Sequence, residues 1–189
     1  TNSCAADVTT VLCVAEGQQA MVLVDMSAQG ITVLEPDKKM GNRLQLTSDI
    51  VFDDVFVPEE HVIAQPGRGL AAALGSLALG RIGIGAVGVG MAQSAFDHAA
   101  RHLRRREAFG HKLGEFQHWQ FRTAEHAIGI ESARSLYQKA ARKFDTTGRA
   151  EPEAAMAKVA GSRIGVDVAR DAIQVHGGYG FVRELTADG

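Results

Sequence analysis

The sequence has very little cysteine. Its two cysteines, Cys4 and Cys13, have no neighbours at metal-ligand spacing. Two cysteines do not staple a chain of 189 residues into a disulfide framework, so we expect reduced thiols in a cytosolic protein. We expect that cytosol to be bacterial rather than a mitochondrial matrix.

A strong net charge and a long apolar run are also lacking. The formal net charge is −2, so no global field attracts nucleic acid. A short basic run at Arg101 and residues 104–106 is also consistent with a solvated helix end. No uninterrupted apolar run reaches the roughly 18 residues of a membrane-spanning helix, so we expect no membrane span. Because Thr1 stands where a start methionine or signal peptide would, we interpret the chain as part of a longer protein.

The first third of the chain has the pattern of β-strands. Short segments rich in β-branched residues are separated by glycine and proline turns, without helical patterns between them. This predicts antiparallel strands at residues 8–14, 20–25, 31–34 and 49–58.

The rest of the chain has the period of α-helices. After residue 69 apolar residues recur every three or four positions, among Ala, Leu, Gln, Arg and Glu. Long helices with short connections predict an antiparallel four-helix bundle. We therefore expect an α+β fold, with part of a β domain at residues 1–64 and a helical domain at 65–189. The expected helices are about 68–78, 79–106, 115–145 and one from Pro152 onward.

Residues 83–88 match G-x-G-x-x-G, a fingerprint of dinucleotide-binding folds. That fingerprint needs a strand on each side of its turn and helix, whereas both flanks here have helical composition. We therefore reject it. Each glycine costs a helix about 1 kcal/mol relative to alanine, which predicts that another backbone or a ligand comes close to this segment.

Two groups of residues are suited to a flat ligand that carries phosphate. Arg106 closes a helix, Phe109 supplies a ring, and Gln117 lies in the first turn of the next helix. Spacing alone fits equally a plain helical hairpin with a surface arginine and a core phenylalanine. In residues 174–180, Gly177 and Gly178 end a helix and leave backbone N–H groups free to donate, although an ordinary glycine cap has the same sequence.

Other polar residues receive a plainer interpretation. Arg81 stands alone on a glycine-rich helix, where an arginine is most often at the surface. Glu115, Glu125 and His126 lie on a charge-rich helix and are interpreted as solvated. The spacing of His111, His118 and His126 does not indicate a metal site.

Five segments in a fixed order resemble the acyl-CoA dehydrogenase family. They are residues 39–58 (K-x-G-x-R, then V-F-D-D-V-x-V-P), 80–84 (G-R-I-x-I), 106–117 (R-x-x-F-G, then Q), 155–158 (A-M-A-K) and 174–180 (Q-x-x-G-G-x-G). The resemblance covers essentially the whole chain. It implies the later part of a middle β domain followed by most of a C-terminal helical bundle.

The resemblance also implies FAD, bound at a subunit interface of a dimer or tetramer. The position that matches Arg81 would lie near the acyl-CoA site. The residues that would contact the FAD of a neighbouring subunit are Arg106, Phe109, Gln117, Gln174, Val175, His176, Gly177 and Gly178.

The implied reaction is the α,β-dehydrogenation of an acyl-CoA thioester to the 2-enoyl-CoA, within fatty acid and lipid metabolism. Electrons would pass to an electron-transfer flavoprotein or a similar acceptor. We expect the catalytic base beyond Gly189, because the alternative family position is Gly80 here, which cannot act as a base. Ala78 and the pair Gln45 and Leu46 also depart from the family pattern, and leave the acyl specificity open.

Two other functions remain open on the same fold. One is a flavin-dependent monooxygenase or a nitroalkane-oxidase relative, which would react with oxygen. The other is a non-catalytic subunit of a heteromer that lends Arg106 and Gln117 to the FAD of a partner.

Overall fold

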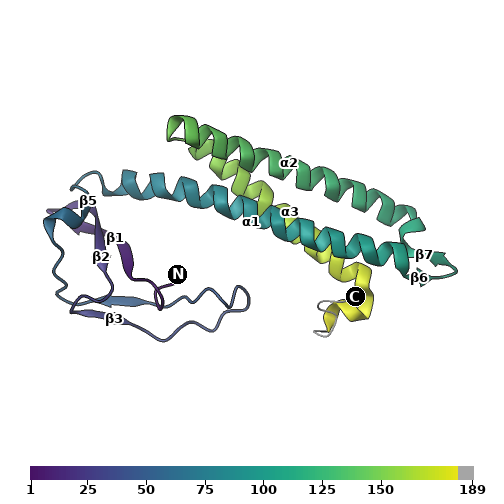
Figure 1. Cartoon of the computed structure of the whole chain (residues 1–189), viewed down its shortest axis with the longest axis horizontal. Coiled ribbons are helices and arrows are strands. Elements are labelled where there is room, and N and C mark those ends of the chain that lie inside the picture. Colours follow the sequence, from purple (N-terminus) through teal and green to yellow (C-terminus); the bar gives the residue numbers. More distant parts are fainter. Residues whose placement is uncertain (183–189) are drawn as a thin grey trace. The chain divides into compact units, whose positions relative to one another are not determined.

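The structure is a computed structural model, which describes residues 1–182 (Figure 1). The chain divides into two compact units, Thr1–Leu74 and a second one that starts at Gly75.

The first unit holds small antiparallel sheets. Strand β1 (Val8–Ala15) pairs with β2 (Gln18–Asp25), which also pairs with β5 (Val62–Ala64). Glu16 and Gly17 join β1 to β2 with φ angles of 53° and 75°, and two residues of positive φ fit the right-handed twist of a tight hairpin. The antiparallel pattern predicted from the sequence is confirmed, but β5 was not predicted.

A second sheet pairs β3 (Ile31–Val33) with β4 (Ile50–Phe52). The predicted strand at residues 49–58 is therefore much shorter than expected. A short 3-10 helix, η1 (Glu59–His61), follows it and leads into β5. Pro58 is the residue before η1, in extended conformation.

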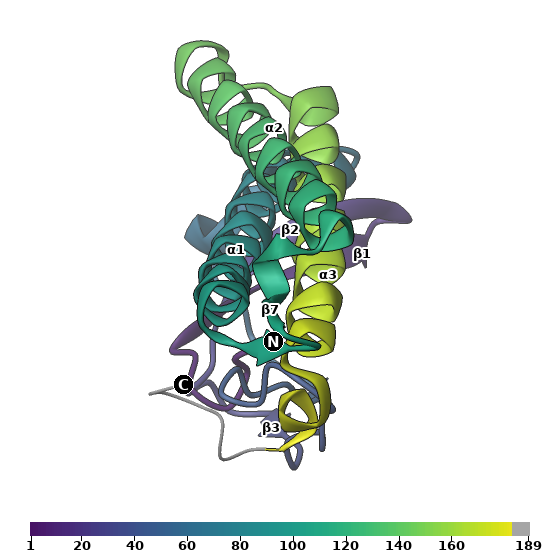
Figure 2. The same cartoon turned by 90° about the vertical axis from the view of Figure 1, so that its right-hand side faces the viewer.

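Three long helices dominate the rest of the chain. They are α1 (Gly69–Arg105), α2 (Gln117–Thr147) and α3 (Glu151–His176). From Gly75 onward they lie beside one another, with α2 running opposite to α1 and α3 (Figures 1 and 2). The prediction of two helices at 68–78 and 79–106 is wrong, because α1 continues through Gly80. A single glycine weakens a helix by only about 1 kcal/mol, which packing readily offsets.

Two apolar clusters hold the three helices together. The first joins Ala78 and Ile82 of α1 to α2 and α3, and the second is centred on Val89, Ile130 and Val168. Among the residues described, the bundle thus has three helices rather than the four that the sequence predicted.

The glycines of the rejected fingerprint allow α1 and α3 to touch. A Cβ atom built on Gly85 would lie 2.8 Å from the carbonyl oxygen of Ala157, and one on Gly88 would overlap Gly161. Close backbone approach is therefore confirmed at these two glycines. At Gly83, and at Gly90 just beyond the fingerprint, a Cβ atom would meet nothing of the described chain within 4 Å, so close approach of a ligand there stays a prediction.

Tight turns connect the helices. Between α1 and α2, strands β6 (Glu107–Ala108) and β7 (His111–Lys112) form a minimal hairpin, followed by the 3-10 helix η2 (Leu113–Glu115). Gly148, with φ of 68°, ends α2, and its N–H donates to the carbonyl of Phe144. The left-handed glycine cap stops α2 and lets α3 turn back.

By length and composition alone, α1 is apolar enough to cross a membrane. An 18-residue window within it has a mean hydropathy of 1.7, and 17% of that window is buried. This window is not the uninterrupted apolar run that the sequence lacks, and one such helix is weak evidence for a membrane span, so the absence of a span stays a prediction. Several large apolar side chains of α1 are exposed, among them Leu77, Leu79, Ile84, Val87 and Met91.

Candidate functional site

A groove of about 530 Å³ lies where the C-terminal ends of α1 and α3 meet. The 3-10 helix η3 (Gly177–Phe181) closes one side of it. We call it the Arg106 groove. Its lining residues are His102, Arg106, Leu113, Val175, His176, Gly177, Gly178, Tyr179 and Val182.

The Arg106 groove brings together five of the residues selected from the sequence. Arg106 from the end of α1 joins Val175 and His176 from the last turn of α3 and the diglycine Gly177 and Gly178. These two sets are far apart in the chain, and only the packing of α1 against α3 unites them.

Backbone hydrogen bonds hold Arg106 on both sides. Its N–H donates to the carbonyl of His102 (2.8 Å), and its own carbonyl accepts from the N–H of Leu113 (2.9 Å). The side chain is exposed and forms no ion pair with any described residue. Among residues 1–182 no carboxylate lines the groove, so within this part of the chain the guanidinium remains available to an anionic ligand.

His102 and His176 stack in the wall of the groove. Their ring centroids are 4.3 Å apart and their planes are inclined by 37°. The Nδ1 of His176 lies 2.7 Å from the carbonyl oxygen of Ala172, which can only accept, so Nδ1 carries the proton. Burial, and then the charges of His176 and Arg106, lower the pKa of His102 below its ordinary value.

His102 was not among the residues that the sequence predicted to contact the cofactor. It lies four residues before Arg106 on α1, and residues at this spacing share a helix face. That spacing was the signal that could have identified it.

The diglycine corner differs in part from the prediction. Gly177 has φ of 60° and ψ of −135°, a conformation that disfavours any residue with a Cβ atom. Its N–H donates to the carbonyl of Gln174. The prediction that this N–H is free for a ligand is therefore wrong. The last carbonyl groups of a helix lack partners within the helix, and here the N–H of Gly177 satisfies the carbonyl of Gln174.

Three of the selected residues lie outside the lining of the groove. Phe109 is 92% exposed in the turn between β6 and β7, edge-on to Phe116 with ring centroids 6.5 Å apart. Its placement in a core, the plainer alternative, is therefore wrong. Gln117 is the exposed first residue of α2, and Gln174 is exposed in the last turn of α3.

Arg81 lies far from the Arg106 groove. It is partly exposed on α1, and at about 1.5 Å per residue the helix places it roughly 37 Å from Arg106. The structure thus separates the residue assigned to acyl-CoA from the residues assigned to the cofactor.

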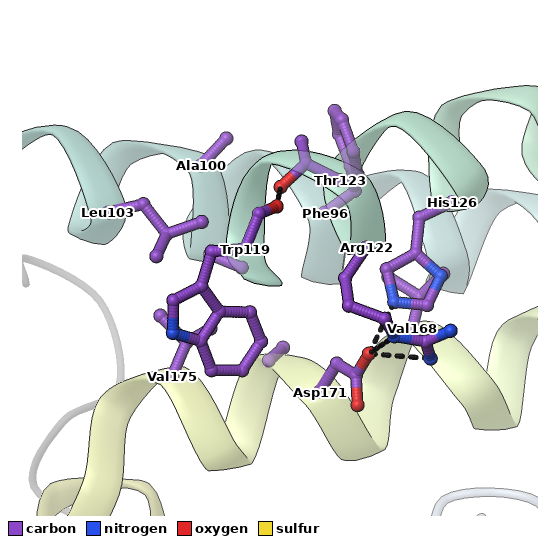
Figure 3. Close-up of a pocket in the computed structure, with 12 residues that line it drawn as sticks. Phe96, Ala100, Leu103, Trp119, Arg122, Thr123, His126, Val168, Asp171 and Val175 are labelled. Atoms are coloured by element: carbon purple, nitrogen blue, oxygen red, sulfur yellow. Dashed lines mark hydrogen bonds and ion pairs between the residues drawn. The ribbon is translucent and has the colours of Figure 1, made fainter. Parts of the chain in front are cut away.

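A second charged site joins α2 to α3 (Figure 3). Oδ2 of Asp171 accepts hydrogen bonds from Nε of Arg122 (2.8 Å) and Nε2 of His126 (2.7 Å). We call these three residues the Asp171 cluster. It borders a cavity of about 20 Å³, which is about the size of one water molecule. Apolar side chains, including Trp119 and Val175, line the rest of this cavity.

The Asp171 cluster corrects the interpretation of His126 as solvated. Its exposed fraction is 7%, and its only described polar side-chain partner is Asp171. Burial raises the pKa of Asp171, but hydrogen bonds from His126 and Arg122 outweigh it, so the net shift is downward. Glu115 and Glu125 are exposed as predicted. Among residues 1–182 no group of three or more metal-ligating side chains comes together.

Comparison with known proteins identifies the family. Residues 67–188 match the family described as acyl-CoA dehydrogenase, C-terminal domain. The chain belongs to the acyl-CoA dehydrogenase family. It is 35% identical over 166 residues to the mitochondrial short-chain specific acyl-CoA dehydrogenase of Rattus norvegicus, covering 88% of this chain and 40% of the rat protein.

Solved structures of the family have the same fold. Butyryl-CoA dehydrogenase from Megasphaera elsdenii matches with a TM-score of 0.94 and 33% identity, over 98% of this chain and 50% of that one. An acyl-CoA dehydrogenase from Bacillus anthracis, solved in complex with FAD, matches with a TM-score of 0.85 and 25% identity, over 98% of this chain and 35% of that one. The chain thus spans half or less of the length of these relatives.

Proposed function

We propose that this chain is part of an FAD-dependent acyl-CoA dehydrogenase that converts an acyl-CoA thioester to the 2-enoyl-CoA. The observation that carries the proposal is the Arg106 groove, a cationic surface that unites residues of two family motifs and has no carboxylate among the described residues that line it. Family membership and the FAD complex of the related Bacillus anthracis protein support it.

The residues of the groove fit the pyrophosphate and ribose end of FAD. A guanidinium without an ion-pair partner offers a planar fork of donors to phosphate oxygens. The diglycine corner has no side chains, so a ligand can approach its backbone closely. Three exposed residues stay predicted contacts of the same cofactor. They are Phe109, three residues after Arg106, and Gln117 and Gln174 at helix ends.

When bound, the flavin would accept the hydride that leaves the β carbon of the substrate. The chain's own contribution is to hold the phosphate end of the cofactor through Arg106 and to keep negative side chains away from it. The general base, which must remove the α proton, is proposed to lie beyond Gly189. No carboxylate among residues 1–182 lines the groove.

The exposure of Arg106 also bears on the proposed partners. The groove is open to solvent at Arg106, as a surface that meets the cofactor of a neighbouring subunit would be. We therefore propose a homodimer or homotetramer, or a heteromer, that passes electrons to an electron-transfer flavoprotein in a bacterial cytosol. Arg81, distant on α1, is proposed to contact the acyl-CoA.

The test uses the purified full-length protein. We expect a yellow protein whose flavin absorbance is bleached by a saturated short-chain acyl-CoA under anaerobic conditions. A colourless preparation that takes up no FAD would overturn the proposal. Rapid oxygen consumption with substrate, without another acceptor, would instead point to an oxidase or monooxygenase.

A further inference from the structure

We propose that His102 is a further cofactor-binding residue, and that it takes up a proton when the phosphate end of the cofactor enters the Arg106 groove. This inference rests on the proposed function, because it concerns the same ligand. It adds a residue that the family motifs do not contain and a coupling between binding and pH.

The first step is the position of the pair. Both rings line the groove, with centroids 4.3 Å apart. His102 lies one helical turn before Arg106 on the same face of α1. A ligand whose phosphate groups reach Arg106 therefore lies next to both imidazoles.

The second step is the charge around the pair. The charged and titratable groups that line the groove are Arg106 on α1, His176 at the end of α3 and Tyr179 on η3. Leu113 of η2 and Val182 complete the wall with apolar side chains. No described residue that lines the groove is a carboxylate, so an incoming anion would be the strongest influence in favour of the protonated form of His102.

The third step is the proton itself. Nδ1 of His176 donates to the carbonyl of Ala172, which fixes this ring beside His102. In the free protein, burial and then the charges of His176 and Arg106 lower the pKa of His102. A bound pyrophosphate opposes this repulsion, so it raises the affinity of His102 for a proton.

The consequence is an affinity for FAD that increases as pH falls from about 8 to about 6, across the range where histidine titrates. By linkage, each unit by which binding raises the pKa of His102 contributes up to about tenfold in affinity. Over this range the pyrophosphate of FAD does not change its charge.

The experiment measures FAD binding to the full-length apoprotein by quenching of flavin fluorescence between pH 6 and pH 8. We expect several-fold tighter binding at the lower pH, with proton uptake visible in a weakly buffered indicator solution. His102→Gln should remove most of the pH dependence. His102→Tyr, which keeps a ring beside His176 but does not titrate in this range, should do the same.

His98→Gln is the matched control. His98 lies one turn earlier on α1, is exposed and does not line the groove, so its loss should leave the pH dependence unchanged. If wild-type protein binds FAD with an affinity independent of pH, or if both His102 variants keep the wild-type dependence, the inference is wrong while the proposed function stands. If the wild-type protein takes up no FAD at any pH, both are wrong.

Discussion

The Arg106 groove and the Asp171 cluster contain the same kinds of side chain but differ in whether a carboxylate accompanies the arginine. Each combines an arginine with a histidine at the surface of α3. In the Asp171 cluster, one carboxylate oxygen accepts from both Arg122 and His126. In the Arg106 groove no carboxylate is present, and the guanidinium has no partner among the described residues.

This difference separates a structural site from a binding site. A partly buried cation that already has a carboxylate partner gains little from a further anion. A cation without one gains a charge-assisted hydrogen bond when a phosphate arrives. The pKa directions agree: the lowered pKa of Asp171 favours its charged form, whereas the lowered pKa of His102 favours its neutral form.

The largest effect on the free energy of unfolding should come from disturbing the close packing of α1 against α3, which supports both regions. A Cβ atom on Gly161 would overlap the backbone of Gly85, so Gly161→Ala should push α3 away from α1. We expect a loss of about 3 kcal/mol in the free energy of unfolding, measured by urea titration.

Gly90→Ala is the control for this prediction. A Cβ atom there would meet nothing within 4 Å, and alanine favours a helix over glycine by about 1 kcal/mol. An equal loss in both variants would refute the close approach of α1 and α3.

Removing the charge of the Asp171 cluster should have the next largest effect. Asp171→Asn leaves His126 buried without a carboxylate partner, whereas Arg122 keeps its ion pair with Glu125 (2.7 Å). Since the side chains of Asp171 and Arg122 are 26% and 37% exposed, solvent weakens the loss, which we expect to be about 2 kcal/mol in the free energy of unfolding. Asp167→Asn, one turn earlier on an exposed face, should cost less than about 0.5 kcal/mol.

The pH dependence of that variant sharpens the comparison. The folded pKa of Asp171 is lowered from its ordinary value of 3.8. Its stabilising contribution is therefore present above that value and is lost as pH falls through the lowered pKa. The stability difference between wild type and Asp171→Asn should shrink below about pH 4. A difference that stays constant in acid unfolding curves would contradict this assignment.

The smallest effect on stability, but a large one on binding, should follow from Arg106→Gln. Because Arg106 has no ion-pair partner, the free energy of unfolding should change by less than about 0.5 kcal/mol. The affinity for FAD should fall roughly 10- to 100-fold, the contribution of hydrogen bonds to a charged group. Arg105→Gln removes the same charge from the neighbouring position outside the groove, and should leave the affinity within about twofold. An equal loss of FAD affinity in both variants would mean that Arg106 acts only through its positive charge and not through direct contact with FAD.

Much of the fold could be predicted from local patterns. The antiparallel strands, the extent of α2 and the start of α3 near Pro152 follow from periodicity and turn residues. The continuity of α1 through Gly80 could not be predicted, because a helix breaker of about 1 kcal/mol is decided by the packing around it. Strand β5 was missed because three residues are too few to show a period.

By itself the sequence determined where most helices and strands form and which motif residues belong to the acyl-CoA dehydrogenase family, since these depend on neighbours in the chain. Only the tertiary structure decided that His126 is buried against Asp171, 45 residues away, and that His102 stacks on His176 beside Arg106. Such contacts depend on which faces of α1, α2 and α3 meet. That choice is made by the packing of buried side chains and close backbones, which no local spacing encodes.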